Sequence, residues 1–121
     1  MTNKMNVDEI VVDGETYVKK SARQYEMTDN YVVVRADRAG VFAGEEYSKN
    51  DHVIELHNCR KLWYWDGAAA VEQLAVDGVS KPENCKFTVE VPKQTVSGWN
   101  QIIPATKKAQ KSIREVSVWL K

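Results

Sequence analysis

The residues best suited to chemistry in this chain of 121 residues lie in the segment NCRKLWYWDGAAA, residues 58–70. An Arg-Lys pair and a leucine precede three consecutive aromatic residues, which lead into an Asp-Gly step and three alanines. Aromatic rings stack on bases, cations neutralise phosphates, and a helix N-terminus offers N–H groups to an anion. The segment therefore predicts a nucleotide-binding surface. The alternative is that Trp63 and Trp65 are core residues of a strand, which is the commoner use of aromatic side chains.

Cations and small residues elsewhere in the chain could complete such a surface. Charge would come from Arg60 and Lys86, with Arg35 as the outlying third cation, and each has the alternative of a solvated or ion-paired role. A glycine lets a ligand approach the backbone closely, and aromatic rings would supply an apolar wall. The candidate ligand-binding residues are Arg35, Gly40, Phe42, Arg60, Trp63, Trp65 and Lys86.

Strand alternation limits how these residues can combine. In a regular strand Arg60 lies on the side of Leu62, and Trp63 lies on the opposite side. A pocket that uses both Arg60 and Trp63 must therefore lie at a strand end, at a bulge or at a boundary between subunits.

Motifs for catalysis and metal binding are missing from the sequence, which has no Walker loop, no GxGxxG, no nucleophile elbow and no HExxH. Cys59 and Cys85 form no CxxC pair, and His52 and His57 have no ligand spacing with them, which argues against zinc. His57 and Cys59 share a strand face by alternation, and that alone indicates no catalytic pair. We therefore expect a binding protein rather than an enzyme, with neither a metal nor another cofactor.

Composition narrows the partners. Lys and Arg together number 17, and so do Asp and Glu, so the formal net charge is zero. Non-specific binding to duplex nucleic acid requires an excess of basic residues and is therefore not expected. No apolar run approaches the roughly 18 residues of a membrane span, and the first ten residues lack the apolar segment of a secretion signal. These features predict a cytoplasmic protein with reduced thiols.

The elements that must position the candidate residues are short strands and two helices. Apolar and β-branched runs predict strands at residues 31–35, 39–47, 52–57, 60–65, 86–91 and 101–103. Asp66 can cap a helix over residues 67–77, which Gly78 would end. Thr106 can cap a basic helix over residues 107–115. The predicted fold class is α+β, with a mostly antiparallel sheet, one main helix after Trp65 and a short C-terminal helix.

The two ends of the chain differ from this central part. Residues 9–19 predict a hairpin around the Asp13-Gly14 turn, and residues 21–30 predict a polar connector. We therefore divide the chain into an arm, residues 1–30, and a single α+β ligand-binding domain, residues 31–121. Residues 116–120 would form a final edge strand or a docking tail.

The order of motifs in residues 31–121 resembles that of a family of short phage and prophage proteins, and residues 1–30 lie outside the resemblance. The matching motifs are Arg35-x4-Gly40-Val41-Phe42-x-Gly44, Asn58-x-Arg60-x-Leu62-Trp63-x-Trp65-x-Gly67-Ala68, Gly78-x3-Pro82-x2-Cys85-Lys86-Phe87 and Ile102-Ile103-Pro104-x-Thr106. The chain is similar to the first type of Thoeris anti-defence protein. The resemblance implies a phage-encoded sponge that sequesters cyclic ADP-ribose isomers made by bacterial TIR-domain enzymes, without degrading them. For some members it also implies cyclic oligonucleotides as ligands.

A cyclic ADP-ribose isomer presents an adenine, two riboses and a pyrophosphate. Its binding needs a stacking ring, a few cations or N–H donors and small residues, but no general acid or base. We therefore expect a sponge that acts in the host cytoplasm and inhibits Thoeris defence. A small phage structural or adaptor protein without a small-molecule ligand is the alternative, and a nucleotide hydrolase comes third. Four tryptophans in so small a domain also predict a homodimer or a higher homo-oligomer.

Overall fold

The computed structural model describes residues 27–120, so the hairpin predicted at residues 9–19 lies outside the described part of the chain. Six strands form one sheet: β1 (Tyr31–Ala36), β2 (Gly40–Lys49), β3 (Val53–Tyr64), β4 (Lys86–Phe87), β5 (Val91–Ser97) and β6 (Trp99–Pro104). The strand order is β4-β3-β2-β1-β6, β5 pairs with β3 off this path, and all these pairings are antiparallel. The predicted mostly antiparallel sheet is confirmed, and its two short helices are compatible with an α+β or a mainly β class.

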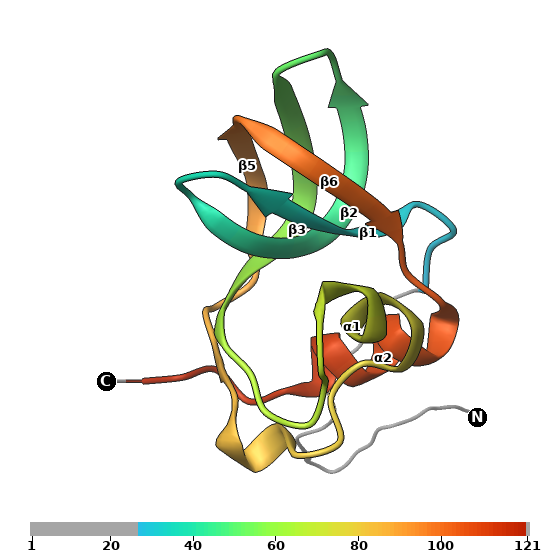
Figure 1. The fold of residues 1–121 in the computed structure, drawn as a ribbon, viewed down its shortest axis with the longest axis vertical. Helices are drawn as coiled ribbons and strands as arrows, with labels where there is room; N and C mark the ends of the chain where they lie inside the picture. The colour runs from blue at the N-terminus through green and yellow to red at the C-terminus, as the bar shows by residue number, and fades with distance from the viewer. Residues whose placement is uncertain (1–26, 121) are drawn as a thin grey trace, which may run out of the picture.

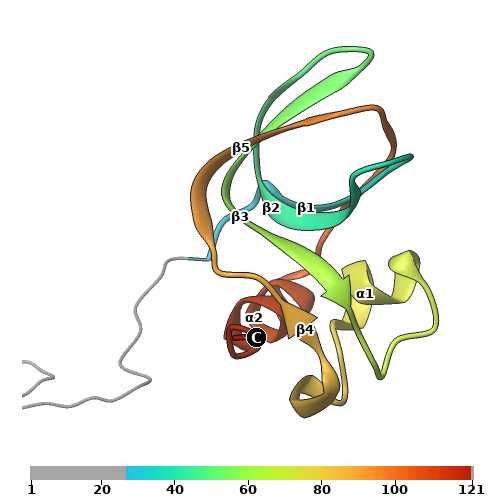
Figure 2. The same ribbon diagram turned by 90° about the vertical axis from the view of Figure 1, so that its left-hand side faces the viewer.

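The long strand β3 gives the sheet its curl. The sequence predicted two strands here, at residues 52–57 and 60–65, but one strand continues through Asn58, whose φ is 50°. The register between β2 and β3 shifts beside it, between Ala43 and Glu45, as expected at a bulge. The first half of β3 pairs with β5 and the second half with β4, so the sheet folds back on itself (Figure 2).

One predicted strand, residues 86–91, divides into β4 and the start of β5. Pro92 directly follows the predicted end of this strand, yet it lies inside β5. This is possible because β5 pairs only with β3, and an edge strand tolerates a residue without an N–H donor. The last predicted strand, residues 101–103, extends to Trp99–Pro104 as β6.

The helix after Trp65 is shorter than predicted. It runs over Val71–Asp77 as α1, with Ala70 as its N-cap and no side-chain capping bond. Asp66 does not cap it, because the Asp66 carboxylate accepts a hydrogen bond from Asn84 Nδ2 at 3.0 Å, in a short 3₁₀ turn at Pro82–Asn84 (η1). The anion site that the sequence placed at a helix start after Asp66 therefore has no structural basis. The predicted end at Gly78 is confirmed, with a φ of 76°.

The C-terminal helix α2 has the predicted bounds, Lys107–Glu115, and the predicted cap. Thr106 Oγ1 accepts a hydrogen bond from the Ala109 N–H at 3.0 Å. After α2 the chain returns to β4, where Val118 forms a parallel bridge with Phe87 and the Trp119 N–H donates to Phe87 O at 2.9 Å. The tail therefore adds an edge to the sheet, one of the two roles predicted for it.

The two faces of the curled sheet carry separate cores. The outer face is covered by α1 and α2, as Figure 1 shows, and its core includes Val33 and Leu62 of the sheet with Leu74 and Ile113 of the helices. The inner, concave face holds a second core, whose buried members are Val32, Val34, Ala36, Phe42, Ile54, Leu56, Cys59 and Val96. Helices cover the outer core, whereas the inner core is enclosed by the curl of the sheet itself.

Candidate functional site

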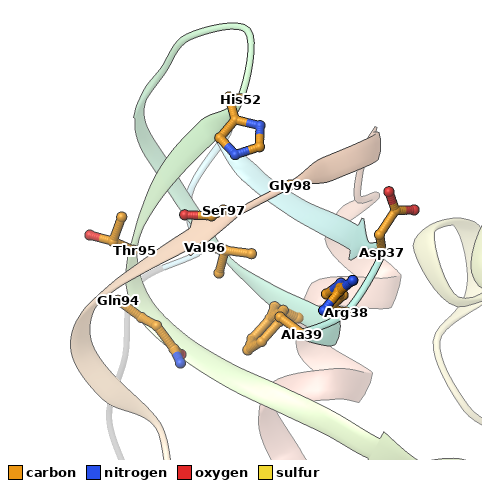
Figure 3. Close-up of a pocket in the computed structure, with 10 residues that line it drawn as sticks. Asp37, Arg38, Ala39, His52, Gln94, Thr95, Val96, Ser97 and Gly98 are labelled. Atoms are coloured by element: carbon orange, nitrogen blue, oxygen red, sulfur yellow. The ribbon is translucent and has the colours of Figure 1, made fainter.

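A cavity of about 540 Å³ opens on the inner face of the sheet, between the β1–β2 turn and β5 (Figure 3). It is lined by Asp37, Arg38, Ala39, Phe42, His52, Gln94, Thr95, Val96, Ser97 and Gly98. Phe42 and Val96 belong to the inner core and are almost fully buried, so this side of the cavity is apolar. The exposed members are mostly polar. An apolar wall with a few polar groups around it is the usual make-up of a small-molecule site.

Backbone hydrogen bonds fix the two sides of this cavity relative to each other. The Asp37 N–H donates to Gly98 O at 3.1 Å, which joins the β1–β2 turn to the connection between β5 and β6. The Gly98 N–H in turn donates to His52 O at 2.7 Å. Gly40, with a φ of 109°, supplies the left-handed backbone that closes the turn. The cavity is therefore built into the sheet and does not depend on a loose loop.

Charged groups of both signs lie at this end of the cavity, where Asp37 and Arg38 line the β1–β2 turn. Arg38 is exposed on the turn and makes no ion pair within residues 27–120. Lys61 pairs with Phe42 across the strands, and its Nζ lies 5.8 Å from the centre of the Phe42 ring. A guanidinium can donate two parallel hydrogen bonds to a phosphate, and Arg38 is the group of the cavity wall best suited to an anion.

Arg60, the leading candidate from the sequence, lies in the protein interior and not on a ligand surface. Its side chain is 2% exposed. Its guanidinium donates to Val116 O at 2.7 Å, Ile113 O at 3.0 Å and, through Nε, to Thr88 O at 2.8 Å. Two of these acceptors are carbonyls at the C-terminal end of α2, where a cation offsets the negative end of the helix dipole. A ligand could contact the Arg60 guanidinium only if its hydrogen bonds to these carbonyls were broken. Arg60 is therefore not part of the site proposed below.

Trp63 and Lys86 do come together, at the β3–β4 pairing that places Tyr64 opposite Lys86. Lys86 Nζ lies 5.4 Å from the Trp63 ring centre, 5.8 Å from that of Tyr64 and 5.2 Å from that of Trp119. Trp63 and Trp119 are stacked, with ring centres 4.9 Å apart. We call Trp63, Tyr64, Lys86 and Trp119 the aromatic–lysine cluster. No local pattern indicates that Trp119, so distant along the chain, joins this cluster.

The surroundings of this cluster do not favour an anionic ligand. The shallow pocket beside it is lined by the carboxylates of Asp66 and Glu83 as well as by Tyr64, Lys86 and Trp119. Two carboxylates against one ammonium give a net negative site, and the ammonium already lies over three rings. The cluster therefore resembles a packing or docking surface more than a phosphate site.

The remaining candidates are dispersed. Arg35 is exposed on β1 near Glu72 of α1, on the helix side of the sheet. Trp65 is partly buried against the outer core. Gly40 lies beside Lys61. Of the seven predicted residues, Phe42 alone lines the cavity described above. Arg38 was not among the candidates because an arginine in a turn is usually solvated. Gln94 was not among them because the sequence of β5 has no apolar periodicity.

Two further groups bear on catalysis. His57 Nε2 lies 2.8 Å from Glu55 Oε2, and its ring stacks on Tyr47, both on the surface of the sheet away from the cavity wall. Burial raises the pKa of the Cys59 thiol to about 12, which disfavours a nucleophilic thiolate. Within residues 27–120 no three His, Cys, Asp or Glu side chains are grouped so that they could hold a metal ion.

Comparison with known proteins gives one finding. A family model described as a domain of unknown function (DUF6948) matches residues 29–113, from just before β1 into α2. No curated protein and no solved structure matches the chain. In the part of the chain that the structure describes, none of the helices has the length and apolar character needed to cross a membrane.

Proposed function

We propose that this chain, which belongs to the family described as a domain of unknown function (DUF6948), binds a cyclic ADP-ribose isomer and holds it without breaking it. The observation that carries the proposal is the cavity, which is lined by the exposed Arg38 and by the buried apolar side chains of Phe42 and Val96. Its volume of about 540 Å³ lies within the roughly 300–1,000 Å³ of small-molecule sites. The resemblance to anti-defence sponges supplies the identity of the ligand.

The chemistry of the cavity suits such a ligand in three respects. The Phe42 and Val96 side chains offer apolar surface to an adenine or a ribose. Arg38, with Lys61 nearby, offers charge to the pyrophosphate. The His52 ring offers a hydrogen bond to the sugars. Held in this way, the ligand would be withdrawn from the host cytoplasm, and Thoeris defence would lose its signal.

Capture and release tests the proposal directly. The protein is incubated with a cyclic ADP-ribose isomer made by a TIR-domain enzyme, freed of unbound ligand and heated, and the released material is examined by mass spectrometry. Intact isomer released by heat supports sequestration. Degradation products would show an enzyme instead, and an isomer that is neither retained nor degraded would leave the adaptor role as the better explanation.

A matched pair of variants locates the site. Arg38→Gln removes a charge-assisted contact worth about 1.5–3 kcal/mol, so the affinity should fall about 10- to 100-fold. Lys86→Gln removes a cation from the aromatic–lysine cluster and should change the affinity less than about twofold. If Lys86→Gln gives the larger loss, the ligand binds at the cluster and the cavity assignment is wrong.

The second candidate function, a structural or adaptor protein, is favoured by the aromatic–lysine cluster. Trp63 is 55% exposed and Tyr64 50% exposed, and Leu120 next to Trp119 is 85% exposed. Exposed apolar surface of this kind is typical of a protein–protein contact. The same surface motivates our proposal of a homodimer or a higher homo-oligomer. Light scattering at micromolar concentration should give a multiple of 13.8 kDa, and Trp63→Ser should lower it; a monomer mass for the unmodified chain would contradict the proposal.

A further inference from the structure

The Gln94 side chain accepts a hydrogen bond from a buried thiol. Gln94 lies on β5 and lines the cavity wall opposite Arg38, as Figure 3 shows. Cys59 Sγ donates to Gln94 Oε1 across 3.4 Å. Cys59 lies on β3, is 0% exposed and belongs to the inner core, so the thiol approaches Gln94 from inside the protein.

The two ends of a glutamine amide are chemically different. Its oxygen accepts hydrogen bonds, and its NH₂ group donates them. The Cys59 thiol keeps its proton because burial raises its pKa to about 12, and a protonated thiol is a donor that selects the amide oxygen. The NH₂ end of Gln94 is then directed away from the thiol, and it makes no hydrogen bond within residues 27–120.

We infer that Gln94 is a specificity-determining residue whose NH₂ group, oriented by Cys59, donates a hydrogen bond to an acceptor atom of the ligand's base. The inference rests on the proposed function, because it names one contact within the same cavity. Arg38 and Gln94 enter from opposite walls, so phosphate and base would be read at opposite sides of the cavity (Figure 3). Cys59 acts as a positioning residue and touches no ligand.

Two substitutions at Gln94 test the contact, with a cyclic ADP-ribose isomer as the probe and calorimetry as the measurement. Gln94→Glu keeps the shape of the side chain but replaces its NH₂ donor with a carboxylate oxygen. This oxygen would repel the acceptor atom of the ligand's base, so the affinity should fall at least tenfold. Gln94→Met removes the donor without repulsion, and the affinity should fall by a smaller factor. Since Gln94 is partly exposed, both variants should fold. Binding of the Gln94→Glu variant within twofold of the unmodified protein would overturn the inference.

Two substitutions at Cys59 test the orientation. Cys59→Ser retains a hydroxyl donor and should bind within about twofold of the unmodified protein. Cys59→Ala has no donor, so the Gln94 amide can rotate by half a turn and the affinity should fall about three- to fivefold. If the alanine variant does not fold, Cys59→Val is measured in its place. Equal losses for the serine and alanine variants would mean that Cys59 contributes only packing.

A spectroscopic measurement separates this inference from the proposed function. The side-chain NH₂ resonances of Gln94, followed by NMR without ligand, should shift in Cys59→Ala and remain close to their original positions in Cys59→Ser. If the unmodified protein binds no cyclic ADP-ribose isomer, the proposed function fails, while these resonances still report on the orientation. If the Gln94 NH₂ resonances do not shift in Cys59→Ala, Cys59 does not orient the amide, and the inference is wrong for any ligand.

Discussion

The inner and outer faces of the sheet use the same residue type in opposite ways. On the outer face, Arg60 is buried and donates to backbone carbonyls of α2 and of the segment after β4. On the inner face, Arg38 is exposed at the edge of a cavity. The difference follows from what lies opposite each guanidinium. Arg60 meets backbone carbonyls at the end of α2 and after β4, whereas Arg38 meets solvent and the space for a ligand.

The comparison also explains why a binding site is expected on the inner face. Two helices cover the outer core and leave room for little besides side chains. The inner core is enclosed only by the curl of the sheet, and the curl does not close between the β1–β2 turn and β5. The inner face is therefore the one where a ligand can be held.

The largest expected effect is that of Arg60→Met. The methionine fills part of the space but leaves the carbonyls of Thr88 and Val116 without the guanidinium donor. The free energy of unfolding, measured in urea, should fall by about 3–5 kcal/mol. The matched variant Arg38→Met should change it by less than about 0.5 kcal/mol. Equal losses of unfolding free energy for the two variants would contradict the structural role assigned to Arg60 and not to Arg38.

This expectation reverses one that the sequence alone supported. If Arg60 and Lys86 were both surface cations, as the sequence suggests, the double change Arg60→Ala with Lys86→Ala would abolish ligand binding and leave the melting temperature near its original value. The buried position of Arg60 now predicts a destabilised protein for that double change, whatever its effect on the ligand.

An intermediate effect is expected from two glycines with the same φ of 76°. A Cβ at Gly78 would collide with Ser112 of α2, so Gly78→Ala should lower the free energy of unfolding by about 2–4 kcal/mol, from backbone strain and crowding together. At Gly98, beside the cavity, a Cβ meets no atom within 4 Å, and Gly98→Ala should cause only the strain, about 1–2 kcal/mol. Thermal unfolding ranks the two variants, and a greater loss at Gly98 would show that the cavity side is the more tightly packed one.

A different kind of effect concerns alkaline pH. Burial raises the pKa of Cys59 from 9.0 to about 12, so as the pH rises the unfolded chain loses this proton before the folded protein does. The associated stability is fully present below pH 9 and is lost as the pH approaches 12. The loss amounts to as much as about 1.4 kcal/mol per pH unit. Urea unfolding between about pH 8 and 10.5 should therefore show a steeper decline for the unmodified protein than for Cys59→Ser, and parallel declines would mean that the thiol is accessible to solvent.

Local signals in the sequence predicted the regular elements well. Thr106 caps α2 as expected because a hydroxyl followed by a helical pattern acts within one turn. The predicted strands at residues 31–35 and 39–47 agree with β1 and β2 within two residues at each end. The prediction that Asp66 caps a helix was wrong because the same carboxylate can either cap a helix or bind a distant amide. Only the fold brings the Asn84 amide within its reach.

The site was harder to predict because its residues are distant in the sequence. Alternation correctly separated Arg60 from Trp63, but it could not show that Arg60 faces the end of a helix more than 50 residues later. Likewise, Phe42 was a candidate for its ring, while Gln94 became one only when β5 folded over the inner core. The partners of a polar side chain, which decide its role, are set by topology.

The hydrogen bonds of Arg60 also govern when the chain can fold during its synthesis. Every residue that lines the cavity has been made by the time the ribosome reaches Gly98. Arg60, however, needs Ile113 and Val116, which follow it by 53 and 56 residues and leave the exit tunnel later than any residue of the cavity. A nascent chain that stops short of α2 would bury a cation without these acceptors, so it should remain unfolded. The residues of the cavity are therefore synthesised before α2, but the cavity forms only after α2 has been made.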